Sequence, residues 1–178
     1  AYLGPLVARY PIDEMPAWVF LELSSFGAFA DFYLFCADRW EDISMKDEHY
    51  LLRRVNSLRN GAAHSSAMIN GLGVGSNLPS GRTTEMVSAA LDKLGVPRRL
   101  RRARLRNPRI LQMTSLAFAY SHFVPQQKQG MASRRLESLE DKAKAHAEWY
   151  RRNNALIASY RFLAMVFGAW IAQNEQSA

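Results

Sequence analysis

The sequence predicts an all-α protein, a helical bundle of about five to seven helices. Apolar residues recur at spacings of three and four along most of the chain, as they do on one face of a helix. No stretch shows the sustained alternation of apolar and polar residues that a half-buried strand requires, so we expect no β-sheet. Glycine and proline clusters separate the helical segments and supply the connections between them.

The expected elements follow one another in the order of these signals. Pro11 and Pro16 bound an entry segment, and Pro16 suits the first turn of a helix. A polar connection is expected over 38–47 and a flexible, glycine-rich loop over 71–82. The segments expected to form helices are 16–37, 48–70, 83–94, 110–123, 133–150 and 153–174.

The composition is that of a globular protein with an excess of basic residues. The chain has 178 residues, which suits a single helical domain over residues 1–178, and 48% of them are hydrophobic. Lys and Arg number 23 against 16 Asp and Glu, and the net charge of +7 favours an anionic partner such as nucleic acid or an anionic membrane surface. Cys36 is the single cysteine and cannot form an internal disulfide, so we expect a reducing compartment, the cytoplasm.

Two apolar stretches, 18–37 and 156–172, raise the question of membrane spans. Glu22 and Asp31 lie in the first stretch and Arg161 in the second, and each charge would be costly inside a bilayer. We therefore interpret both stretches as core helices and expect no membrane partner. The chain has no signal peptide and does not begin with Met, so we expect it to be a processed or partial product.

The most informative segment is Arg59–His64, whose sequence is RNGAAH, inside the expected helix 48–70. An imidazole exchanges a proton near neutral pH, and a guanidinium holds phosphate oxygens. These are the minimum groups for cutting RNA without a metal ion. A pattern this short occurs often by chance, so its surroundings decide how much weight it carries.

Helix geometry places His64 away from the expected core. One face carries an apolar stripe made of Leu51, Val55, Leu58, Ala62 and Ile69. The other side carries Arg53, Asn56, Asn60, His64 and Ala67. His64 is therefore expected to face solvent, where it is either a functional residue or a surface histidine with no role.

Arg59 and Gly61 leave the geometry of the segment open. Arg59 is about 140° from His64 on an ideal helix, so it either swings round to His64 or meets a second copy of the motif across a dimer. Gly61 costs about 1 kcal/mol against Ala inside a helix, and it would let another chain approach closely. Asn60-Gly61 can instead form a turn, which would end the helix and separate the motif residues.

Two motifs resemble a known family. The segment RNGAAH at 59–64, followed by Asn70, is similar to the Arg-Asn-x-x-Ala-His…Asn segment of AbiD/AbiF-type abortive-infection proteins, which belong to the HEPN superfamily. The upstream segment 16–27, PAWVFLELSSFG, resembles that family's Pro-x-Trp…Glu-x-x-Ser-Phe-Gly stretch. The resemblance extends from about Pro11 to Asn70 and is vague beyond it. Where the family often has an arginine three residues after the histidine, this chain has Ala67.

The resemblance implies a HEPN-like bundle that forms the C-terminal part of a longer architecture. It implies a metal-independent endoribonuclease of an abortive-infection or toxin-type antiphage system, with no cofactor. The catalytic residues would be Arg59, Asn60 and His64, at a homodimer interface formed by their helix. The RNA 2′-OH would attack the adjacent phosphate and leave a 2′,3′-cyclic phosphate. Asn56 and Asn70 are expected to support the site, and an antitoxin or regulatory RNA would be a further partner.

Arginines are concentrated between residues 98 and 109, and no acidic residue occurs from Lys93 to Arg135. The guanidinium fork suits phosphate, so we expect this run to bind RNA, with anionic lipid as the competing partner. Salt would weaken either interaction. The arginines expected to contact RNA are Arg98, Arg99, Arg101, Arg102, Arg104, Arg106 and Arg109.

Other chemistry-bearing residues point to no further site. His49, His122 and His146 have no Cys or carboxylate partners at metal-ligand spacing, so we expect no metal. Trp149 and Tyr150 lie beside two arginines, and we interpret them as packing anchors rather than as a stacking surface for bases. Two other functions compete with the endoribonuclease. One is a non-catalytic RNA-binding helical protein with a degenerate motif, and the other is a peripheral membrane or protein-interaction domain.

Overall fold

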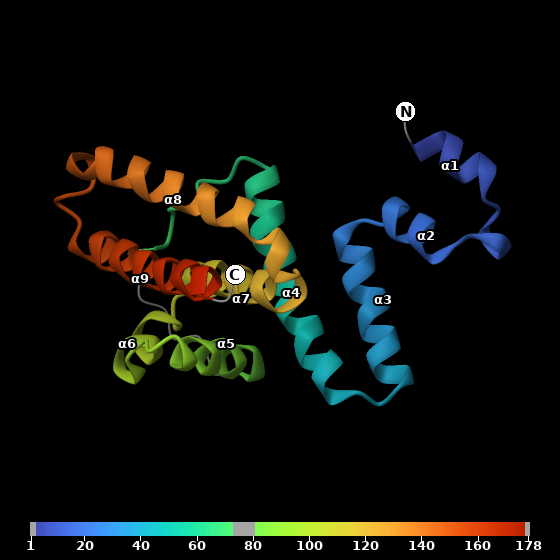
Figure 1. The fold of residues 1–178 in the computed structure, drawn as a ribbon, viewed down its shortest axis with the longest axis horizontal. Coiled ribbons are helices and arrows are strands. Elements are labelled where there is room, and N and C mark those ends of the chain that lie inside the picture. Colours follow the sequence, from blue (N-terminus) through green and yellow to red (C-terminus); the bar gives the residue numbers. More distant parts are fainter. Residues whose placement is uncertain (1–2, 73–80, 177–178) are drawn as a thin grey trace. The chain divides into compact units, whose positions relative to one another are not determined.

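The computed structural model describes residues 3–72 and 81–176, and helices with short connections make up these ranges (Figure 1). The all-α prediction is confirmed, and the described residues contain no strand. They form nine α-helices, more than the five to seven expected. The helices are α1 (Leu3–Arg9), α2 (Ala17–Leu23), α3 (Phe26–Arg39), α4 (Ile43–Ala63), α5 (Arg82–Lys93), α6 (Arg98–Arg104), α7 (Pro108–Phe123), α8 (Gly130–Ala145) and α9 (Asn154–Gln176).

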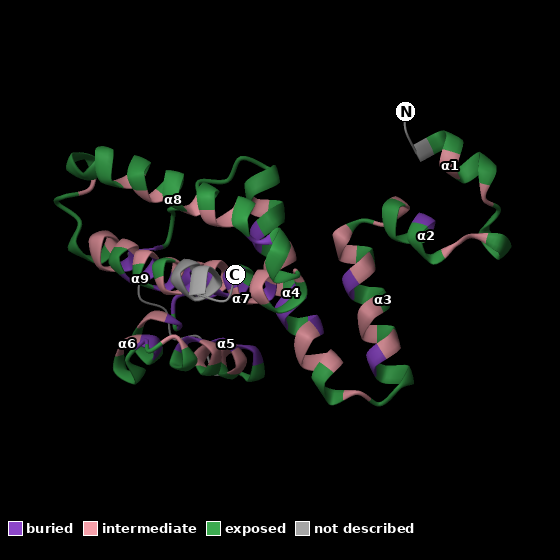
Figure 2. Ribbon diagram, viewed as in Figure 1, coloured by how far each residue is buried: buried purple, intermediate pink, exposed green. Residues whose placement is uncertain are grey.

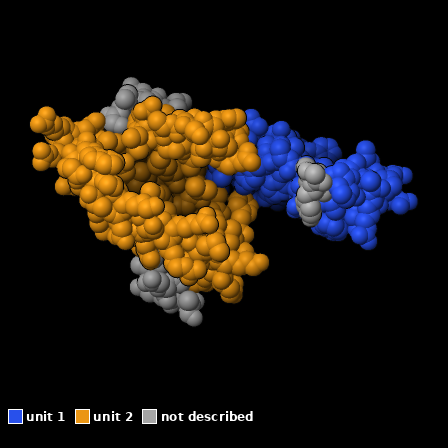
Figure 3. All heavy atoms as spheres, turned by 90° about the horizontal axis from the view of Figure 1, so that it is seen from above, with its two compact units in different colours: residues 1–56 blue, residues 57–178 orange. Residues whose placement is uncertain are grey.

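The chain divides into two compact units, residues 1–56 and residues 57–178 (Figure 3). The sequence predicts one domain instead. Helix α4 belongs to both units, because the boundary falls between Asn56 and Ser57 inside this helix. Most of the expected loop over 71–82 lies outside the described residues, which include only its first two and last two positions. Among the described helices, none is both long and apolar enough to cross a membrane.

The first unit is built from α1, α2, α3 and the first part of α4. The helix expected over 16–37 is interrupted, because Ser25 caps a new helix and its side-chain oxygen accepts a hydrogen bond from Ala28 N at 3.1 Å. The core of this unit is small and includes Val19, Ala30 and Leu51, all fully buried. His49 is buried beside them, with Nδ1 2.8 Å from the carbonyl oxygen of Ala30.

The second unit is organised around α7, which packs against α5 and α9, while α6 packs on α5 and α8 on α9. Asn107 starts α7 by accepting hydrogen bonds from the backbone N–H groups of Arg109 and Ile110, at 2.9 and 3.1 Å. Buried residues lie on α5, α7 and α9, whereas α8 has none (Figure 2). The largest fully buried side chains here are Phe162, Ile110, Leu111, Val87, Val96 and Val166.

The two units differ in charge as well as in core. Residues 1–56 contain five basic and nine acidic side chains, a net charge of −4. Residues 57–178 contain 18 basic and seven acidic side chains, a net charge of +11. The excess of positive charge in the sequence therefore belongs entirely to the second unit.

Candidate functional site

Helix α4 ends at Ala63, seven residues before the end that the sequence predicts at Asn70. His64 is the last residue that continues the helical pattern, because its N–H donates to Asn60 O at 3.0 Å. Ser65 then takes a left-handed conformation, with φ 54°. The N–H groups of Ser65 and Ser66 donate back to Ala62 O and Gly61 O, at 3.1 and 2.9 Å. This is a Schellman motif, and it fixes His64 at the C-cap of the helix.

The motif residues lie on the surface of the last two turns of α4. Arg59, Asn60 and His64 are all exposed, and Arg59 Nη1 donates to Asn60 Oδ1 at 3.1 Å. The alternative of a turn at Asn60-Gly61 is excluded, since both residues lie inside the helix. The guanidinium, the amide and the imidazole are thus all open to a ligand on one short stretch of helix.

The expected apolar stripe is correct only for its first part. Leu51 and Leu58 are buried and Val55 is half-buried. Ala62 is exposed, and Ile69 is 53% exposed because the helix has ended before it. Helical periodicity therefore gave the correct face only up to the last turn of α4.

The segment after the motif is anchored at its far end. Gly71 adopts φ 83°, and its carbonyl oxygen accepts a hydrogen bond from Asn107 Nδ2 at 2.6 Å. The carbonyl oxygen of the next residue, Leu72, accepts from the buried hydroxyl of Ser159 at 2.7 Å. Asn70, expected to support the site, is exposed in this segment rather than on α4. The segment from His64 to Leu72 is therefore held by α4 at one end and by α7 and α9 at the other.

The first turn of α7 contacts the motif helix. Arg109 Nη1 lies 3.7 Å from the position that a Cβ on Gly61 would occupy. The same Nη1 donates to Gln112 Oε1 at 3.1 Å, and Gln112 Nε2 donates to Ser57 Oγ on α4 at 3.1 Å. Sequence reasoning missed this junction because it joins residues about fifty positions apart through side chains. Asn107-Pro108 is an N-cap signature, and it is the only part of this junction that the sequence indicates.

The arginines of the run do not share one environment. Arg98, Arg99, Arg102 and Arg106 are exposed, whereas Arg104 is half-buried. Arg101 is only 6% exposed, and its Nη1 donates to the carboxylate of Asp92 and to the carbonyl oxygen of Val96. The prediction that Arg101 binds RNA is therefore not supported, because its guanidinium is occupied in joining α6 to the end of α5.

Asn56 lies one helical turn before Asn60 on α4 and is half-buried, so its supporting role stays a prediction. It lies in the first unit, where its Nδ2 is 3.4 Å from the position that a Cβ on Gly27 would occupy.

In the second unit, Trp149 is 75% exposed and its ring stacks on His146, with centroids 4.0 Å apart. The interpretation of Trp149 as a packing anchor is wrong, whereas Tyr150 is half-buried against Tyr160, with centroids 5.0 Å apart.

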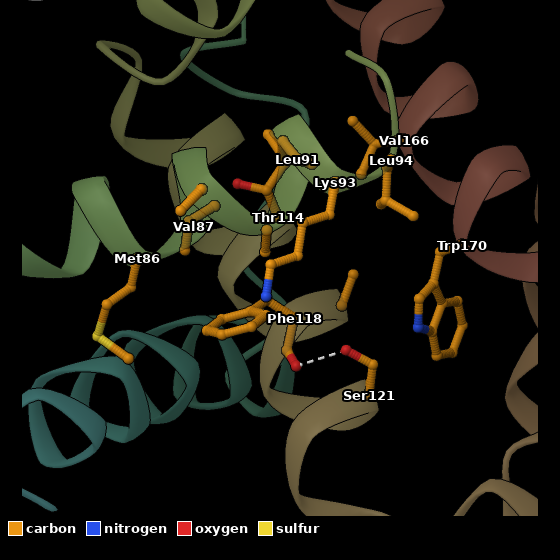
Figure 4. Close-up of a pocket in the computed structure, with 13 residues that line it drawn as sticks. Met86, Val87, Leu91, Lys93, Leu94, Thr114, Phe118, Ser121, Val166 and Trp170 are labelled. Carbon is orange, nitrogen blue, oxygen red and sulfur yellow. Dashed lines mark hydrogen bonds between the residues drawn. The ribbon is translucent and has the colours of Figure 1, made fainter. Parts of the chain in front are cut away.

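The second unit also contains a cavity of about 340 Å³ between α5, α7 and α9 (Figure 4). Its walls are mainly apolar and include Val87, Phe118 and Trp170. Among the described residues that line this cavity, Lys93 is the only ionisable one, so they lack the paired groups that acid–base chemistry needs. Over residues 3–72 and 81–176, no three His, Cys, Asp or Glu side chains lie close enough together to hold a metal ion.

No family model, curated protein sequence or solved structure matches this chain. The resemblance to abortive-infection proteins therefore stays a prediction that depends on the two motifs alone. The structure contributes the exposure of Arg59, Asn60 and His64 together, within the unit of net charge +11. Such a surface can attract a polyanion and offers it both a guanidinium and an imidazole.

Proposed function

We propose that the chain is a metal-independent endoribonuclease of the abortive-infection type, an antiphage or toxin-like effector of the bacterial cytoplasm. The observation that carries this proposal is the joint exposure of Arg59, Asn60 and His64 on the last turns of α4, in a strongly basic unit. The exposed arginines of α6 and its flanks, Arg98, Arg99, Arg102 and Arg106, belong to the same unit and would bind the RNA backbone.

The proposed chemistry needs only groups that RNA and this site provide. The 2′-oxygen attacks the adjacent phosphorus as its proton passes to a base, and the bond from phosphorus to the 5′-oxygen breaks. The 5′-oxygen takes a proton from an acid, so the products are a 2′,3′-cyclic phosphate and a 5′-OH. His64 would act as the acid or the base, and Arg59 would stabilise the charge on the phosphoryl oxygens. In a homodimer the second His64 would supply the other proton-transfer group.

The test is incubation of the purified protein with a mixed RNA pool in EDTA, beside Arg59→Ala and His64→Ala. We expect cleavage by the parent chain, a loss of about 10²–10⁴-fold in the His64 variant, and cyclic phosphate on the new 3′ ends. His122→Ala, which removes another exposed histidine of the same unit, is the matched control and should cleave as the parent does. DNA of the same sequence should stay intact, because it has no 2′-OH.

A second function, non-catalytic RNA binding with a degenerate motif, is favoured by one observation. His64 follows directly on the end of α4, and no side chain in the described part of the protein hydrogen-bonds its ring to orient it as a general base requires. RNA binding by the parent chain without cleavage between pH 5 and 9 would support this second function and exclude the first.

A further inference from the structure

We propose that Arg109 is a second phosphate-binding residue of this site and contacts the RNA phosphate beside His64. The inference rests on the proposed function, because it adds a guanidinium to the surface formed by Arg59, Asn60 and His64. Within one chain, it places Arg109 rather than Arg59 next to His64. The sequence assigns Arg109 only to a general RNA-binding run.

The position of Arg109 follows from its contact with Gly61. Its Nη1 lies 3.7 Å from where a Cβ on Gly61 would be, so the guanidinium covers the face of α4 to which Gly61 points. Residues three apart on a helix are surface neighbours, about 5–6 Å between their Cβ atoms. Gly61 and His64 are such a pair, and His64 N–H still makes the helical hydrogen bond to Asn60 O. The Arg109 guanidinium therefore lies on the His64 side of the helix.

Arg59 points elsewhere on the same helix. At about 100° per residue, Arg59 is about 140° from His64, whereas Gly61 is only about 60° from it. Arg59 Nη1 also donates to the neighbouring Asn60 Oδ1. Within one chain, the guanidinium on the face of His64 is thus that of Arg109, and Arg59 is placed to serve a site that a second chain completes.

The guanidinium of Arg109 is held in place by a neutral side chain. Its hydrogen-bond partner, Gln112 Oε1, is neutral, and Gln112 is fixed in turn by Ser57. Its Cγ lies 3.8 Å from the Cβ position of Gly71, whose carbonyl oxygen is bonded to Asn107. Among the described residues no carboxylate forms an ion pair with Arg109. A half-buried cation with spare N–H donors and no carboxylate is suited to an oxyanion ligand.

The experiment compares Arg109→Ala and Arg109→Lys with the parent chain in two assays. The first measures RNA cleavage in EDTA, and the second measures affinity for uridine 3′-phosphate by the NMR shift of the His64 ring. We expect Arg109→Ala to lose about 10- to 100-fold in cleavage and to weaken probe binding. It should also lower the slope of log affinity for single-stranded RNA against log salt by about 0.7. Arg161→Ala, an exposed arginine of α9, is the matched control and should change neither quantity.

Each outcome decides between the two proposals. If Arg109→Lys keeps the slope of log affinity against log salt and Arg109→Ala lowers it, Arg109 makes a charge contact with RNA, which a purely structural role would not produce. If the Ala variant does not fold, the Lys variant is compared with the parent chain instead. Unchanged probe binding and cleavage in both variants, with a parent chain that cuts RNA, would overturn the assignment of Arg109 and leave the endoribonuclease standing. A parent chain that never cuts RNA, but whose probe affinity depends on Arg109, would support the phosphate site and refute the enzyme.

Discussion

The first unit is acidic and exposes many aromatic side chains, whereas the second is basic and contains most of the core. Residues 1–56 have a net charge of −4 and expose Trp18, Phe35 and Trp40 by more than half. Residues 57–178 have a net charge of +11, and their buried core includes Phe162 and Ile110. The net charge of the whole chain hides this division. A polyanion would be attracted to the second unit and repelled by the first, so the location of a motif matters more than the average charge.

The two motifs of the family resemblance fall on opposite sides of this division. The segment 16–27 lies in the first unit, where it forms α2 and the start of α3. The segment 59–64 lies in the second, at the end of α4. The groups with acid–base and phosphate chemistry therefore belong to the unit that also carries the positive charge, and the aromatic motif belongs to the other.

The largest expected effect comes from a matched pair of core substitutions, Leu51→Ala in the first unit and Leu111→Ala in the second. Both side chains are at most 1% exposed, so each change should cost about 2–5 kcal/mol of its own unit's stability. We expect hydrogen exchange to show lost protection in α7 and α9 for Leu111→Ala, with α3 unaffected. Equal loss in both units from either substitution would mean that they unfold as one and would remove the distinction between them.

A smaller effect with the opposite sign is expected for Gly61→Ala. The new Cβ would lie 3.6 Å from Met68 Sδ and 3.7 Å from Arg109 Nη1, which are ordinary van der Waals distances. Alanine should therefore raise the free energy of unfolding by about 0.5–1 kcal/mol through helix propensity. Thermal melting checks this expectation, and a drop in stability would contradict it. Cleavage that is lost while stability rises would indicate that the new methyl group displaces either the Arg109 guanidinium or another chain that approaches α4 at Gly61.

An effect similar in size to that of Gly61→Ala distinguishes a tyrosine in each unit. Tyr33 donates a hydrogen bond to the carboxylate of Glu48, and burial followed by this hydrogen bond raises the pKa of Tyr33. Burial also raises the pKa of Tyr160 in the second unit, with a further contribution from Tyr150. Tyr33→Phe should therefore cost about 1 kcal/mol at pH 7, and Tyr160→Phe less, since no carboxylate contributes to its shift.

The contribution of Tyr33 to the free energy of unfolding is also expected to depend on pH. A tyrosine whose pKa is higher in the folded state stabilises the fold below its unfolded pKa of about 10, and this stabilisation is lost as the pH rises further. Denaturant unfolding between pH 8 and 11 should show a fall in the parent chain above pH 10. The fall should be smaller in Tyr33→Phe. An identical fall in that variant would show that Tyr33 does not contribute to it.

Sequence patterns predicted the helices that pack by one regular face and missed those that depend on local chemistry. Helices α5, α7 and α9 lie within two residues of the expected bounds, because periodicity and Asn or Pro signals mark them. Helix α6 was not predicted, since the arginine run hides any apolar period. The end of α4 was missed because Ser65, rather than a glycine, takes the left-handed position.

The candidate site was predictable in its local part only. Helix geometry correctly placed His64 on the surface. It also predicted that Arg59 and His64 point in different directions from the helix of one chain. The sequence grouped Arg101 and Arg109 in one run, although the first pairs with Asp92 and the second lies against Gly61. Such differences arise from tertiary contacts between helices, which no single segment encodes.

Helix α4 also limits where this protein can be divided for study. A chain that begins at Ser57 would keep only Ser57–Ala63 of the helix and would lose the backbone hydrogen bonds made to the preceding turn. A helix of that length has little stability of its own, so Arg59 and Asn60 would fray in such a fragment. A fragment that retains the motif in its folded form must therefore start no later than Ile43, where α4 begins.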